Sequence, residues 1–251
     1  MKPRTVLIVL ALVWLGVLLT VPFVGARLIT PWEVASDEAL STIFWTLRFP
    51  RVLLAVLAGG ALAMSGLGLQ TLFRNPLAEP YTLGIASGAA LGAVLALQFE
   101  ALGVSLGFPV VALAAFRGAL AVAAIILGLA MSGYAREVST LLLAGIAISL
   151  SCSALVLFVQ YLADLTQTFR MVRWMMGGLA VVGYGEVLWV LPWALGGAVI
   201  LMLLRWDLNL LITGEELAAS RGVDLQRLRL LVLGVASAMV AALVAVTGPI
   251  G

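Results

Sequence analysis

Seven apolar runs, most of them long enough to cross a bilayer, constrain this chain more than any other feature of its sequence. A helix rises 1.5 Å per residue, so about 20 apolar residues cross a hydrocarbon core of about 30 Å. The runs are Thr5–Val24, Val52–Phe73, Leu83–Gln98, Pro109–Met131, Thr140–Leu162, Val187–Leu204 and Leu228–Val246, of which the third and sixth are short. Open sheets would leave unpaired backbone groups in lipid. The sequence therefore predicts an all-α, polytopic transmembrane helical bundle forming a single domain, residues 1–251.

The composition agrees with a chain surrounded by membrane lipid. Hydrophobic residues make up 63% of it and charged residues 10%, and the mean hydropathy is +1.18. Soluble domains carry roughly 25% charged residues because water must wet their surface. The net charge of +2 is too small to indicate nucleic-acid binding.

Several residue types that catalysis needs are missing. The chain has no His, and its one cysteine, Cys152, lies in an apolar run. These absences exclude a disulfide within the chain, a thiolate metal site and a Ser-His protease site. The one lysine, Lys2, cannot complete a phosphate-binding G-x-x-x-x-G-K-[ST] loop. We expect no catalytic residue, metal site or cofactor here, and ATP hydrolysis, if any, in a separate subunit.

Basic residues near the ends of the runs indicate the orientation. A cytoplasmic N-terminus places eight of them inside (Lys2, Arg4, Arg74, Arg136, Arg205, Arg221, Arg227 and Arg229) and five outside (Arg27, Arg48, Arg51, Arg170 and Arg173). The positive-inside rule favours this arrangement. The first run is longer than the 7–15 residues of a signal-peptide core, so we expect it to remain as a span.

Ionisable side chains are nearly absent from the runs. Arg117, in the fourth run, is the exception. It either faces an interior cavity as a functional cation, or extends to the outer interface or a polar partner. A secondary transporter or channel of another polytopic fold is the alternative function, but such carriers usually place acids in the bilayer, and no Asp or Glu lies centrally in a run.

Two short patterns predict local structure. Gly84, Gly88 and Gly92 recur at every fourth residue, a spacing that lets helix backbones approach closely. The segment Gly214-Glu215-Glu216-Leu217-Ala218-Ala219-Ser220-Arg221-Gly222 predicts a short cytoplasmic helix with acids at its start and a glycine stop. That helix is either a solvated linker or a surface that seats on a partner.

A series of motifs then resembles a known family. The motifs are Arg48-Phe49-Pro50-Arg51, Gly59-Gly60-Ala61-Leu62-Ala63 with Ser65-Gly66 and Gln70, the hairpin Arg74-Asn75-Pro76-Leu77-Ala78-Glu79-Pro80, Leu83-Gly84 with Ser87-Gly88-Ala89, Leu141–Ile146, Trp174-Met175-Met176-Gly177-Gly178, Gly214–Val223 and Gly248-Pro249-Ile250-Gly251. In this order, from about residue 30 onward, they resemble FecCD-type permeases. These are the membrane subunits of type II ABC importers for ferric siderophores, haem and cobalamin.

The resemblance implies a permease in a bacterial or archaeal cytoplasmic (inner) membrane that works with several partners. They are a second permease subunit, which we expect to form a homodimer, two cytoplasmic ABC ATPases and an extracytoplasmic substrate-binding protein. It implies that Arg48, with Arg51 nearby, docks the binding protein, and that Gly214–Gly222 is the helix that couples to the ATPase. The regions Ser132–Ser139 and Ala163–Met176 match a gate and a short helix near the substrate path.

The sequence departs from the family pattern in two ways. Family members have about ten spans, whereas seven are present here and the chain stops inside the Gly248–Gly251 motif. We therefore expect a C-terminal truncation, and a fragment that does not transport alone. Arg117 is the other departure, because the family usually has an apolar residue there. The chelate stays open among ferric siderophore, haem and cobalamin, with iron chelates the broadest class.

Overall fold

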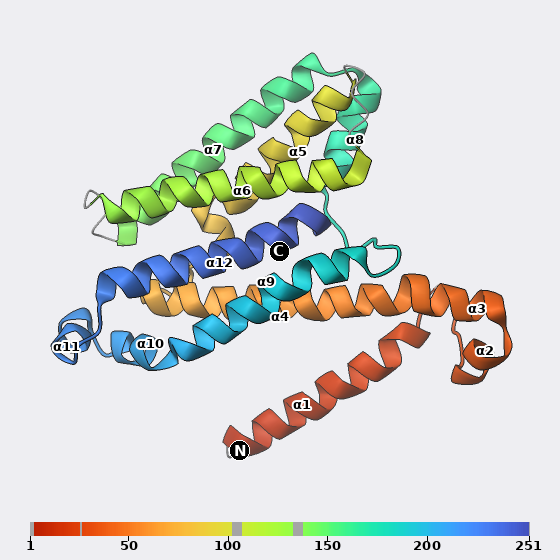
Figure 1. Cartoon of the computed structure of the whole chain (residues 1–251), viewed down its shortest axis with the longest axis horizontal. Helices are drawn as coiled ribbons and strands as arrows, with labels where there is room; N and C mark the ends of the chain where they lie inside the picture. The colour runs from red at the N-terminus through yellow and green to blue at the C-terminus, as the bar shows by residue number, and fades with distance from the viewer. Residues whose placement is uncertain (1–2, 26, 102–106, 133–137, 251) are drawn as a thin grey trace. The chain divides into compact units, whose positions relative to one another are not determined.

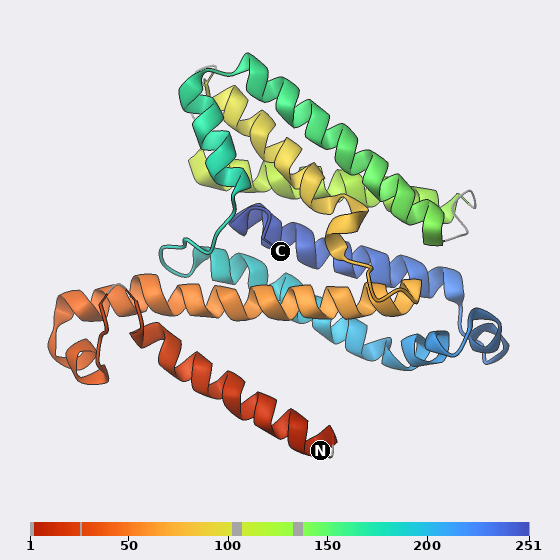
Figure 2. The same cartoon turned by 180° about the vertical axis from the view of Figure 1, so that it is seen from behind.

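A computed structural model describes residues 3–25, 27–101, 107–132 and 138–250 as helices joined by short connectors, with no strand among these residues (Figures 1 and 2). The long helices are α1 (Pro3–Thr20), α4 (Phe49–Phe73), α5 (Ile85–Ala101), α6 (Gly107–Met131), α7 (Val138–Leu162), α9 (Gly185–Leu203) and α12 (Leu225–Thr247). The short elements are η1 (Val21–Phe23), α2 (Pro31–Ser36), α3 (Glu38–Ile43), the π-turn η2 (Phe44–Arg48), η3 (Pro80–Leu83), α8 (Leu165–Met175), α10 (Arg205–Ile212) and α11 (Glu215–Ser220).

Every predicted apolar run coincides with a helix, whereas the predicted count of seven spans is not confirmed. Among the described residues, six helices are long and apolar enough to cross a membrane: Arg4–Phe23, Glu38–Phe73, Val110–Met131, Ser139–Leu162, Gly185–Leu203 and Leu225–Thr247. The third predicted run begins in η3, and the helix that follows it, α5, has 17 residues. The second span also begins earlier than predicted, because α3, η2 and α4 continue one another.

The chain divides into two compact units. The first contains Met1–Leu57 and Leu179–Leu188, and the second Ala58–Gly178 and Trp189–Gly251. In the first unit, Phe44 of η2 packs against Phe23, Trp45 and Phe49, with ring centroids 5.0–6.2 Å apart. The Gly183 amide donates to the Thr46 carbonyl at 2.8 Å and fixes the 179–188 segment to the same unit. That residues 1–251 act as one permease domain stays a prediction.

Helix α12 is at the centre of the second unit. Of its apolar window, 67% is buried, against 17% for the window in α7. Helices α5 and α6 pack on it and on one another, and α6 runs beside α12 in both views of the fold (Figures 1 and 2). Small residues permit this close packing because they let helix backbones approach in the absence of a hydrophobic driving force.

Candidate functional site

Arg48 ends the π-turn at the start of α4 and is half-buried. Its Nη1 donates to the Phe23 carbonyl at 3.1 Å, and its Nη2 donates to the Arg27 carbonyl at 2.7 Å. A Cβ at Gly25 would lie only 2.9 Å from Nη2, so the segment after α1 is closely fitted around the guanidinium. Arg48 therefore holds this segment against the start of α4.

Arg51 follows within the same helical turn but differs in its surroundings. Its side chain is exposed, and no hydrogen bond or ion pair joins it to another described residue. Of the two arginines predicted to dock a binding protein, Arg51 has its guanidinium available, whereas Arg48 uses its donors within the chain.

Glu33 stabilises the same unit at the start of α2. Its carboxylate accepts from the Thr30 amide at 2.7 Å and from Arg27 Nη2 at 2.9 Å, and the Thr30 hydroxyl accepts from the Glu33 amide in return. This is a capping box, the arrangement that satisfies two free amides at a helix start. Hydrogen bonds hold the pKa of Glu33 below its ordinary value. The bond from the Thr30 amide contributes most, and the bonds from the Thr30 hydroxyl and Arg27 contribute less.

The predicted short helix at Gly214–Gly222 is present as α11. Glu215 and Glu216 lie in its first turn, and Gly214 and Gly222 flank it with φ angles of 133° and 86°. The Val223 amide donates to the Ala218 carbonyl at 3.1 Å and the Gly222 amide to the Ala219 carbonyl at 3.0 Å, which is the Schellman stop that glycine favours. The two glycines thus set both ends of α11.

The side chains of α11 divide into an anchored set and an exposed set. Ala218 is fully buried, and Glu215 lies 3.6 Å from Arg229 of α12. Glu216, Leu217 and Arg221 are exposed. Within the second unit, α11 lies beyond the neighbouring ends of α10 and α12 (Figures 1 and 2). It therefore presents an apolar residue flanked by two opposite charges.

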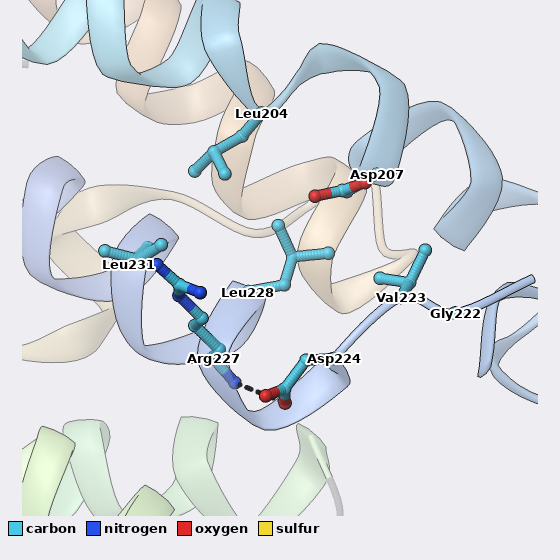
Figure 3. Close-up of a pocket in the computed structure, with 8 residues that line it drawn as sticks. All are labelled: Leu204, Asp207, Gly222, Val223, Asp224, Arg227, Leu228 and Leu231. Atoms are coloured by element: carbon cyan, nitrogen blue, oxygen red, sulfur yellow. Dashed lines mark hydrogen bonds between the residues drawn. The ribbon is translucent and has the colours of Figure 1, made fainter.

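A pocket of about 340 Å³ lies beside α11, between α10 and the start of α12 (Figure 3). Its apolar wall is made by four residues, Leu204, Val223, Leu228 and Leu231, and its polar residues are Asp207, Asp224 and Arg227, with Gly222 at the edge. Asp224 is the N-cap of α12, since its carboxylate accepts from the Arg227 amide at 3.0 Å. No hydrogen bond or ion pair joins the Asp207 carboxylate to another described residue. This pocket could not be predicted from the sequence, because its residues come from separate helices.

The motif hairpin between α4 and η3 is closed by hydrogen bonds of Asn75. Arg74 takes a left-handed φ of 47°, and the Asn75 amide donates to the Gln70 carbonyl at 3.1 Å, closing a Schellman stop. The Asn75 side chain accepts from the Leu77 amide at 2.9 Å, and Pro76 follows as a helix breaker. Ala78 and Pro80 are buried, while Arg74, Pro76 and Leu77 are exposed.

The three predicted packing glycines lie against other helices of the second unit. A Cβ at Gly88 would lie 2.6 Å from the Gly118 carbonyl of α6, and one at Gly92 would clash with the Ala114 carbonyl. Gly84 takes a φ of 79°, and a Cβ there would lie 3.1 Å from the Gly145 carbonyl of α7. The partners Gly118 and Gly145 were not predicted, although each is a glycine within an apolar run.

The other predicted regions are located as follows. Most of the turn Ser132–Ser139 lies outside the described residues. The segment Ala163–Met176 contains α8, whose N-cap Asp164 accepts from the Gln167 amide at 2.8 Å. After α8, the Gly178 amide donates to the Thr247 carbonyl at 2.7 Å, and the Tyr81 hydroxyl donates to the Ile250 carbonyl. Gly177 also lies against the Pro249 carbonyl, so the motifs at Trp174–Gly178 and Gly248-Pro249-Ile250 meet in the second unit.

Helices of bilayer length with largely apolar outer faces, joined by short polar connectors, define a polytopic α-helical membrane protein. No group of His, Cys, Asp and Glu among the described residues is arranged to hold a metal ion. The chain belongs to the FecCD transport family, which it matches over residues 6–251.

Several relatives have named transport systems. The chain is 38% identical over 229 residues to the hemin transport system permease protein HmuU of Yersinia pestis, which covers 88% of this chain and 66% of the relative. It is 36% identical over 225 residues to the cobalamin import system permease protein BtuC of Halobacterium salinarum, covering 88% of this chain and 58% of the relative. It is 34% identical over 255 residues to the molybdate import system permease protein MolB of Haemophilus influenzae, covering 98% and 73%. The chain thus spans about three fifths to two thirds of HmuU and the Halobacterium protein.

A solved structure has the same fold. It is an inward-facing conformation of a metal-chelate type ABC transporter, with a TM-score of 0.86 and 29% identity. The match covers 100% of this chain and 78% of that one. The predicted family and the predicted helical bundle are confirmed.

Proposed function

We propose that the chain is the membrane-spanning permease subunit of an ATP-driven ABC importer for a metal chelate or a related metal-containing anion. The family match over residues 6–251 supports this function. The hemin, cobalamin and molybdate relatives indicate the range of substrates. The observation that carries it is α11, a six-residue helix with both ends set by glycines and an exposed Glu216, Leu217 and Arg221. A solvated linker would not need this fixed presentation.

In this proposal the chain performs no chemistry. ATP binding and hydrolysis in a cytoplasmic ATPase dimer shift the permease between its inward- and outward-facing states, and α11 transmits the shift because it contacts the ATPase differently in each. The pocket beside α11 gives the ATPase a second contact, since its Asp207 carboxylate has no partner among the described residues. A second permease subunit, in our proposal an identical chain, forms the other half of the path.

On the outside, a substrate-binding protein docks at Arg51. Arg48 serves this docking indirectly, because it holds Phe23 and Arg27 against the start of α4. The orientation that this requires has the N-terminus in the cytoplasm of a bacterial or archaeal cell, with α11 inside and Arg51 outside.

Co-purification from detergent tests the proposal. The chain is co-expressed with the ABC ATPase subunit of its own transport system, as the intact sequence and as the double variant Glu216→Lys, Arg221→Glu. We expect the intact chain to retain the ATPase and the double variant to retain at least tenfold less, with an unchanged melting temperature. Glu38→Lys, an equally exposed acid in the first unit, is the matched control and should retain the ATPase fully. Failure of the intact chain to retain any ATPase would contradict the proposed function.

A further inference from the structure

Arg117 interrupts an apolar stripe on the outer face of α6. The stripe contains Val110, Leu113, Leu120 and Ile125, all exposed, and Arg117 is exposed within it. No hydrogen bond or ion pair joins the Arg117 guanidinium to another described residue. An outward apolar stripe on a spanning helix faces acyl chains, where an unpaired cation is costly. The guanidinium therefore needs water or an anionic partner from beyond the described residues.

The position of Arg117 along α6 places that partner at the membrane interface. The span begins at Val110, so seven residues, or about 10 Å of helix rise, separate Arg117 from the near end of the span. Side chains on a helix tilt toward its N-terminus, which here is the near end. An extended arginine reaches about 6 Å farther in that direction, which brings its guanidinium to the depth of the lipid glycerol and phosphate groups.

An aromatic cluster lies at the same depth on the same side of the membrane. Phe116, the neighbour of Arg117, packs against Trp189 and Trp193 of α9, with ring centroids 5.7 and 5.3 Å apart. Trp193 is exposed. Tryptophan rings are enriched at this level of a bilayer because they are amphipathic. Because Phe116 directly precedes Arg117 in α6, the cluster lies one helix position from the cation.

We propose that Arg117 and this cluster bind one phospholipid in the leaflet where α6 begins. The guanidinium takes the lipid phosphate, since its planar donors match two phosphate oxygens at once. Phe116 and Trp193 pack along the glycerol and the first acyl carbons. The site lies on the outer face of α6 and shares no residue with α11 or with the proposed docking position.

Native mass spectrometry of the delipidated chain tests this site. The probes are phosphatidylglycerol and a diacylglycerol with the same acyl chains, which lacks only the phosphate headgroup. We expect the intact chain to bind phosphatidylglycerol at least tenfold more tightly than diacylglycerol. Arg117→Ala should reduce phosphatidylglycerol binding to the diacylglycerol level, and Arg117→Lys should retain part of the difference. Arg205→Ala, which removes an exposed arginine at the start of α10, is the matched control and should bind as the intact chain does.

Two results would overturn the proposal. One is phosphatidylglycerol binding by Arg117→Ala equal to that of the intact chain. The other is a loss of dimers in Arg117→Ala with lipid binding unchanged, which would assign the cation to an acidic partner on a second copy. Arg117→Gln, which keeps a polar side chain of similar length, replaces Arg117→Ala if melting temperatures show that the alanine variant does not fold.

Discussion

Two charged regions of this chain differ in how many of their charged side chains act within the chain. In the segment that leads into α4, Arg48 donates to backbone carbonyls, and Glu33 caps α2 while pairing with Arg27. In the segment from α10 to α12, Glu215 pairs with Arg229 and Asp224 caps α12, but the exposed side chains of Glu216 and Arg221 have no hydrogen-bond or ion-pair partner among the described residues. Charges at a membrane surface can thus hold a loop or remain available for a partner, and the surrounding acceptors decide which.

If the charges serve loops and partners, packing must hold the helices of the second unit together. Gly118→Leu tests this requirement and has the largest expected effect. A side chain there would meet the Gly88 carbonyl and the Gly92 Cα, which are backbone atoms that cannot move aside. We expect a loss of at least about 3 kcal/mol of stability, or no folded protein, measured by thermal unfolding in detergent. Gly128→Leu on the same helix, where no atom lies within 4 Å of the position that a Cβ would take, should be nearly neutral.

Arg48→Gln should separate a structural arginine from an available one. The change removes charge-assisted bonds to the Phe23 and Arg27 carbonyls, and hydrogen bonds of this kind contribute about 1.5–3 kcal/mol each. Because the site is only partly buried, we expect a total loss of about 2 kcal/mol and faster amide exchange in residues 21–29. Arg51→Gln should change stability by less than about 0.5 kcal/mol, as exposed sites usually do. Equal losses in both variants would contradict the distinction between the two arginines.

Asp224→Ala tests the pocket acid that makes a hydrogen bond within the chain. Its carboxylate caps the start of α12, and loss of an N-cap costs about 1 kcal/mol. Asp207→Ala removes the pocket acid that has no partner among the described residues, and it should cost less than about 0.5 kcal/mol. Chemical denaturation of the two variants measures the difference. A larger loss for Asp207→Ala would show that the Asp207 carboxylate also stabilises the fold.

The smallest expected effect is the pH dependence of α2. The capping box lowers the pKa of Glu33 below its ordinary value of 4.5, so its contribution is complete above that value and is lost as the pH falls through the lowered pKa. Amide exchange in Pro31–Ser36, corrected for intrinsic rates, should therefore rise on acidification below this range. Glu33→Gln should remove most of that dependence, and an unchanged acid response in this variant would assign it to another group.

Much of the fold could be predicted from the sequence because its determinants are local. The apolar runs specify helices, Gly214 and Gly222 set the ends of α11, and the Asn75-Pro76 pair specifies its turn. What could not be predicted depends on distant partners. Arg48 bonds to carbonyls 21–26 residues away, and Gly118 meets glycines of another helix. The count of seven spans stays a prediction, because η3 takes the first residues of the third run and α5 has 17 residues.

The proposed function depends most directly on Arg51 and α11 facing opposite sides of the membrane. Single cysteines at the exposed positions Arg51 and Leu217, in a chain carrying Cys152→Ser, can be labelled in whole cells with a membrane-impermeant maleimide. We predict labelling of Arg51→Cys in intact cells, and of Leu217→Cys only after the membrane is permeabilised. Labelling of Leu217→Cys in intact cells would place α11 outside the cytoplasm, beyond the reach of an ATPase, and would contradict the proposed function.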